Sequence, residues 1–171
     1  GTGTPVATAS FETYSNPDYG ISLSYPAGWD VQETDPAACR VVRDYGKQAC
    51  TIVTFYSPQP NATGYSTVRV DVGDPTTSSL EEYFNQATVS LEDLYHPLSL
   101  TRNNFQLRIA NQSGYRLEYL KKNDPSRPGT AVFTMTKDHI PYIIVADNGN
   151  LDETMLESFT ITPVSGTTKS A

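Results

Sequence analysis

The stretch Y-G-I-S-L-S-Y-P-A-G-W-D-V, from Tyr19 to Val31, decides the fold class of this chain. Its first seven residues alternate between apolar and serine side chains, which is the period of a strand that buries one face. The residues predicted to face the core are Tyr19, Ile21, Leu23 and Tyr25. Pro26-Ala27-Gly28 ends this strand, and the only tryptophan, Trp29, is expected to begin a second strand and to be mostly buried.

The rest of the chain predicts an α+β domain with an antiparallel sheet. Apolar residues at helical spacing predict a helix that starts at the capping box Ser78-Ser79-Leu80-Glu81 and ends near Tyr95-His96-Pro97. A short helix is expected at Leu151–Ser158, capped by Asn150. Further strands are predicted near 51–56, 68–72, 99–109, 114–121, 130–137 and 140–146. Strands, a helix, hairpin-spaced strands and a closing helix are typical of an antiparallel sheet covered by helices.

Composition favours an extracytoplasmic protein. Only 18% of the 171 residues are charged, and eleven tyrosines outnumber six phenylalanines. The net charge of −7 argues against a nucleic-acid partner. No run of apolar residues is long enough to span a membrane. We expect residues 1–10 to be a flexible linker that remains after removal of a signal or anchor segment, 11–162 to be one monomeric domain, and 163–171 to be a flexible tail.

Two kinds of covalent modification are predicted. Cys39 and Cys50 flank the turn formers Asp44 and Gly46, which suits a hairpin or long loop closed by a disulfide, although a reduced pair is the alternative. The sequons at Asn61 and Asn111 are glycosylation candidates in turn-like segments, and chance matches to this motif are common.

Two segments resemble PsbP-like domains. The opening F-E-T-Y-S-N-P-D-Y-G-I-S-L-S-Y-P-A-G-W-D-V, Phe11 to Val31, resembles the N-terminal signature of that family, and L-E-S-F-T-I-T, Leu156 to Thr162, resembles its ending. The resemblance implies an α/β/α sandwich around a twisted antiparallel sheet. The family includes photosystem II proteins, a Ran-release factor and prokaryotic surface lipoproteins. The basic docking surface of the plant proteins has no match in this acidic chain, so exported prokaryotic domains are the nearer likeness.

Candidate chemistry is sparse. His96 precedes a proline at a helix exit and His139 lies in a predicted hairpin turn, and no zinc, nucleotide or nucleophile-elbow motif accompanies them. No organic cofactor is therefore expected. The weak calcium candidates Asp147, Asn150, Asp152 and Glu153 have suitable oxygen atoms, but their spacing differs from a calcium loop and also fits a capped strand-to-helix turn.

The sequence leaves three functional hypotheses. The first is a non-enzymatic interaction or ligand-binding module at the cell surface, held to the membrane only by a removed N-terminal anchor. The second is an extracytoplasmic hydrolase with an unrecognised site. The third is a calcium-assisted structural or adhesion domain.

Overall fold

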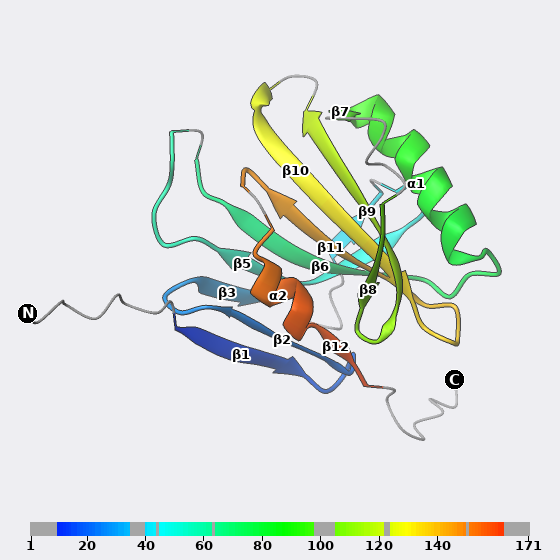
Figure 1. Ribbon diagram of the computed structural model, residues 1–171, viewed down its shortest axis with the longest axis horizontal. Helices are drawn as coiled ribbons and strands as arrows, with labels where there is room; N and C mark the ends of the chain where they lie inside the picture. Colours follow the sequence, from blue (N-terminus) through cyan, green and yellow to red (C-terminus); the bar gives the residue numbers. More distant parts are fainter. Residues whose placement is uncertain are drawn as a thin grey trace, which may run out of the picture.

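The computed structural model describes residues 10–34, 40–43, 45–62, 64–97, 105–121, 124–149 and 151–162 (Figure 1). The predicted linker before residue 10 and the predicted tail after residue 162 lie outside these ranges and stay predictions. Two helices are described, α1 (Leu80–Leu94) and α2 (Glu153–Ser158). Neither of them is long and apolar enough to cross a membrane.

The described strands form two antiparallel sheets. Sheet A has the order β1-β2-β12, and the main path of sheet B has the order β3-β5-β6-β11-β10-β9-β7, with β4 paired to β5 and β8 paired to β9. The strands of sheet A are β1 (Phe11–Asn16), β2 (Ile21–Pro26) and β12 (Thr160–Ile161). The strands of sheet B are β3 (Asp30–Glu33), β4 (Arg40–Val42), β5 (Ala49–Tyr56), β6 (Thr67–Gly73), β7 (Tyr95–Pro97), β8 (Phe105–Ile109), β9 (Gln112–Lys121), β10 (Asp124–Met135) and β11 (Pro141–Asp147).

The helix α1 covers one face of sheet B because its apolar stripe matches that face (Figure 1). Phe84 of α1 stacks on Tyr115 with 5.0 Å between ring centroids and meets Phe133 edge-on at 5.3 Å. The helix begins one residue later than the sequence pattern predicts. The hydroxyl of Ser79 accepts a hydrogen bond of 3.1 Å from the backbone N–H of Glu82, so Ser79 and not Ser78 caps the helix.

The other face of sheet B packs against sheet A and α2 together (Figure 1). Phe55 of sheet B meets Tyr14 edge-on at 5.7 Å and Tyr25 at 5.0 Å, so aromatic rings join the two sheets. The predicted antiparallel sheet is confirmed. A layer of helices on both of its faces is not confirmed, because strands supply much of the second layer.

The opening stretch forms a strand and places its apolar side chains against the core as predicted. Ile21 and Leu23 are buried, and Tyr19 and Tyr25 pack against the same core with part of their surface exposed. Trp29 is partly buried and packs against the same core, in agreement with the prediction that it is mostly buried. It follows Gly28, whose φ of 89° turns the chain, and β3 begins one residue later than predicted, at Asp30.

Candidate functional site

The acidic loop between β11 and α2 is held by fold-stabilising contacts. The Asp147 carboxylate lies 3.6 Å from Nη2 of Arg127. Asn148 is buried with a φ of 60°, and its side-chain amide donates to the side chain of Asn61 and to the backbone oxygen of Tyr65, both at 3.2 Å. This loop is therefore a turn that fastens the end of β11 to the connection between β5 and β6.

The remaining calcium candidates have separate structural roles. Asp152, rather than Asn150, caps α2, because its carboxylate accepts from the backbone N–H groups of Thr154 at 2.8 Å and Met155 at 3.3 Å. Glu153 pairs with Nη1 of Arg116 at 3.1 Å. Asn150 lies outside the described residues. Within the described ranges, no group of three or more His, Cys, Asp or Glu side chains could hold a metal ion.

The two histidines lie in the segments where the sequence predicts them. His139 occupies the β10–β11 turn with a φ of 59°, is exposed, and places its Nδ1 3.1 Å from the backbone oxygen of Ser78. The backbone of His96 lies in β7, directly after α1, and pairs with Leu120. The side chain of His96 is outside the described part of the chain.

The predicted modification sites are described only in part. Val41 pairs with Cys50, which confirms a hairpin between β4 and β5, but Cys39 lies outside the described residues and the disulfide stays a prediction. Asn61 is exposed, yet its amide is held by Asn148. Asn111 is exposed in the two-residue turn between β8 and β9, with a φ of 61°. Glycosylation of either asparagine stays a prediction.

A closed polar network lies where the loop after β4 crosses the end of β6; we name it the Asp71 cluster, comprising Tyr45, Thr51, Arg69 and Asp71. Asp71 has no exposed surface. Its carboxylate accepts from Thr51 Oγ1 at 2.8 Å, from Arg69 Nε at 3.0 Å and from the Tyr45 hydroxyl. Burial, and then the charge of Asp71, raises the pKa of Tyr45 well above its usual value. The cluster is an ion pair between Arg69 and the buried Asp71, and both oxygen atoms of the Asp71 carboxylate accept hydrogen bonds.

A pocket of about 290 Å³ adjoins this cluster; we name it the Lys47 pocket. It is lined by Lys47, Gln48, Asp74, Pro75, Thr76 and Tyr83. The half-buried ammonium of Lys47 donates to Thr76 Oγ1 at 3.1 Å and to Ser78 Oγ at 3.2 Å, and it lies 5.7 Å from the centre of the Tyr83 ring. Its partners are thus two neutral hydroxyls and an aromatic face.

Tyr83 forms a wall of the Lys47 pocket and is 2% exposed. Its buried hydroxyl has no hydrogen-bond partner among the described residues. Burial, followed by the charges of Asp71 and Asp74, raises the pKa of Tyr83 to about 12. The hydroxyl therefore keeps its proton and is a donor without an acceptor.

Close packing fixes the position of the Tyr83 ring. A side-chain carbon built on Gly73 would lie 2.5 Å from Cγ of Pro141 and 3.0 Å from the Tyr83 hydroxyl. Only glycine therefore lets β6 pass this close to both residues.

Three connections meet at the Lys47 pocket. The loop before β5 supplies Lys47, the β6–α1 loop supplies Thr76, and the β10–β11 turn supports that loop through a bond of 3.0 Å from the Thr76 backbone N–H to the oxygen of His139. Sequence patterns did not indicate this site, since the turn formers near Asp44 and Asp74 show only that loops exist.

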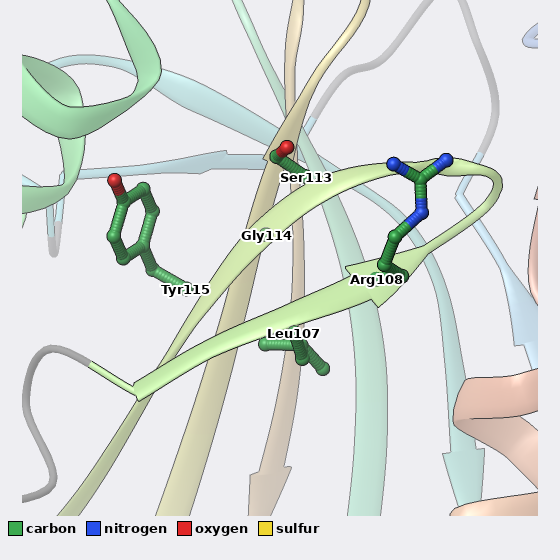
Figure 2. A pocket seen from close by; sticks show the side chains of 5 residues that line it. All are labelled: Leu107, Arg108, Ser113, Gly114 and Tyr115. Atoms are coloured by element: carbon green, nitrogen blue, oxygen red, sulfur yellow. The ribbon is translucent and has the colours of Figure 1, made fainter.

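A second hollow of about 330 Å³ lies on the β8–β9 hairpin, lined by Leu107, Arg108, Ser113, Gly114 and Tyr115 (Figure 2). Its charged group, Arg108, is exposed and donates to the backbone oxygen of Asn111 at 2.7 Å. The backbone oxygen of Ser113 accepts from the hydroxyl of Thr134 at 2.8 Å. No lining residue of this hollow carries a buried polar atom without a partner in the described structure, so the Lys47 pocket is the stronger candidate.

No protein-family model matches the sequence, and no curated protein matches it. Two solved structures are similar over nearly the whole chain. The solution structure of the cyanobacterial PsbP protein CyanoP from Synechocystis sp. PCC 6803 matches with a TM-score of 0.55 and 16% identity, over 95% of this chain and 98% of CyanoP. The crystal structure of LpqN, involved in cell envelope biogenesis of Mycobacterium tuberculosis, matches with a TM-score of 0.59 and 13% identity, over 94% of this chain and 90% of LpqN.

These likenesses show that the chain has a PsbP-like fold. The resemblance of residues 11–31 and 156–162 to PsbP-like domains is thereby confirmed at the level of fold, whereas the α/β/α arrangement that it implied is not. At these identities the likeness concerns fold alone, so function has to be argued from the site.

Proposed function

We propose that the protein is a non-enzymatic, extracytoplasmic binding module of PsbP-like fold, and that its ligand or partner group binds in the Lys47 pocket. The location is supported by the Tyr-rich composition with few charged residues, and by the likeness to a protein involved in cell envelope biogenesis. We further propose that the module acts as a monomer.

One observation carries the binding role. Lys47 places a half-buried positive charge in a pocket where its hydrogen-bond partners are two neutral hydroxyls. Removal of a charge from water is costly unless an opposite charge compensates it. A bound group would supply that compensation, which makes the pocket suited to binding.

The same contacts support a role without catalysis. Asp71, the most deeply buried carboxylate described, is occupied by three donors, and His139 is an exposed turn residue. Asp152 and Glu153 are engaged at the start of α2. Catalytic groups need a free lone pair or proton facing a substrate, and these groups are engaged in holding the fold.

The binding role is tested by NMR with isotope-labelled protein and a panel of small neutral and charged compounds. Resonances of residues 47, 74–76 and 83 should shift together with at least one compound. The shifts should disappear in Lys47→Met and persist in Lys137→Met, because Lys137 is an exposed turn lysine outside the pocket. A panel that shifts no pocket resonance contradicts the binding role.

The location is tested in cells that produce the natural full-length protein. A membrane-impermeant amine reagent should label this protein in intact cells, whereas a cytosolic control protein should be labelled only after lysis. Labelling of both proteins only after lysis would place the protein inside the cell and contradict the proposed location.

A further inference from the structure

The charge balance of the Lys47 pocket indicates the chemistry of its ligand. Lys47 makes no ion pair with any described carboxylate, and its two hydrogen bonds to Thr76 and Ser78 leave one of its three N–H groups without an acceptor. The pocket thus offers one positively charged donor that neighbouring hydroxyls hold in place.

A second donor without an acceptor lines the same pocket. The Tyr83 hydroxyl is buried, has no partner among the described residues, and lies close to the backbone of Gly73. Two donors and no matched acceptor favour a ligand group that accepts hydrogen bonds.

The start of α1 adds to the positive potential. Ser78 and Ser79 precede the first residue of this 15-residue helix, and the Lys47 ammonium bonds to Ser78. The N-terminal end of a helix carries a partial positive charge that favours an anion. Because Glu81 and Glu82 lie in the first turn of α1 and oppose this partial charge, Lys47 remains the main positive group of the pocket.

Asp74 limits how much negative charge the pocket can accept. This exposed carboxylate belongs to the lining, opposite in sign to Lys47. A group with two negative charges would be repelled by Asp74 and would have only one full positive charge to balance it. A group with one negative charge is repelled less by Asp74 and is matched by the single charge of Lys47.

We infer that the Lys47 pocket binds a single carboxylate group, which accepts a hydrogen bond from the Lys47 ammonium and a second one from the Tyr83 hydroxyl. The inference rests on the proposed function that this pocket is a binding site. Because the Tyr83 hydroxyl is shielded from solvent, the carboxylate reaches it only when the lining relaxes, so Tyr83 contributes less than Lys47. The carboxylate belongs to a sugar acid or to the end of a peptide, which present the same chemistry.

The test is an NMR titration at neutral pH with four probes that form two matched pairs. D-glucuronate and N-acetylglycine carry the carboxylate, and D-glucose and N-acetylglycinamide are their uncharged counterparts. At least one carboxylate probe should bind with a Kd on the order of millimolar, about tenfold more tightly than its neutral counterpart. The probe that binds better identifies the source of the carboxylate.

Variants locate the interaction. Lys47→Met should weaken carboxylate binding about tenfold, and Tyr83→Phe should weaken it about two- to fivefold, while Lys137→Met leaves it unchanged. An unchanged amide spectrum of each free variant, away from the substituted residue, shows that the fold is retained. Raised salt should weaken binding to the wild type and have little effect on Lys47→Met.

Three outcomes overturn the inference. Equal binding of the neutral probes at the pocket, with loss in Lys47→Met, rejects the carboxylate and leaves the binding role intact. Inorganic phosphate is titrated as an additional probe, and tighter binding of phosphate than of either carboxylate probe rejects the restriction to one negative charge. If no probe binds and no compound of the panel shifts the resonances of the pocket residues, both the carboxylate and the binding role are rejected.

Discussion

The Asp71 cluster and the Lys47 pocket both draw on residues 45–51 and 69–76, with Tyr83 of α1 added in the pocket, yet they differ in how charge is balanced. In the Asp71 cluster, three donors surround one carboxylate and the charge of Arg69 balances that of Asp71. In the Lys47 pocket, the ammonium donates only to neutral hydroxyls and the Tyr83 hydroxyl has no acceptor among the described residues. The difference separates two uses of charge: a network with all its donors matched stabilises the fold, and the nearby group with unmatched donors is the one that we propose binds a ligand.

The largest effect should come from opening the closed network. Asp71→Ala removes the only carboxylate of the cluster, and with it the acceptor of one hydrogen bond each from Arg69, Tyr45 and Thr51. We expect the free energy of unfolding to fall by about 3–5 kcal/mol, as measured by urea denaturation. Asp74→Ala, at the exposed rim of the Lys47 pocket, is the matched control and should change stability by less than about 0.5 kcal/mol. Equal losses in the two variants would remove the distinction between the two regions.

Alkaline pH should lower the free energy of unfolding through Tyr83, which lines the Lys47 pocket. Its pKa is raised from 10.0 to about 12, so between these values the unfolded chain releases a proton that the folded protein retains. The contribution of this group to stability is complete below pH 10 and is lost as the pH rises towards 12. The loss is on the order of 2–3 kcal/mol. The difference in free energy of unfolding between Tyr83→Phe and wild type should therefore widen in favour of the variant between these pH values, and parallel pH profiles would contradict this account.

The smallest effect, and the sharpest comparison, comes from removing one hydroxyl in each region. Tyr45→Phe deletes a donor to the buried Asp71 carboxylate and should lower the free energy of unfolding by about 1–3 kcal/mol. Tyr83→Phe deletes a buried hydroxyl that lacks a partner and should raise it by up to about 1 kcal/mol at neutral pH. Both values come from thermal or urea denaturation of otherwise identical proteins. A destabilised Tyr83→Phe variant would show that the hydroxyl already has an acceptor.

Sequence patterns predict the elements of this fold well where the pattern is local. The alternation from Ile21 to Tyr25 and the helical stripe of α1 are recognisable because each segment buries one face. Boundaries are less predictable. Ser79 rather than Ser78 caps α1, and Asp152 rather than Asn150 caps α2, because several adjacent residues can cap and tertiary contacts select one.

The candidate site was not predictable from the sequence. The acidic loop after β11 has the composition of a calcium site, whereas its described residues cap a helix, pair with arginines or shape a turn. Lys47, Thr76 and Tyr83 form no sequence motif, since they come from separate segments that meet only through the order of strands in sheet B. A site that long-range strand pairing assembles leaves no local signal.

The strand order of sheet A has a consequence for how the protein folds. Its central strand, β2, takes one partner from β1 and the other from β12, so Ile21 pairs with Ile161 across nearly the full length of the domain. Contacts between residues so far apart in sequence form late and slow the folding of small domains. A growing chain that leaves the ribosome from its N-terminus therefore keeps one edge of β2 without its β12 partner until residues 160–161 have been synthesised, and an unpaired strand edge can pair with other chains during that time.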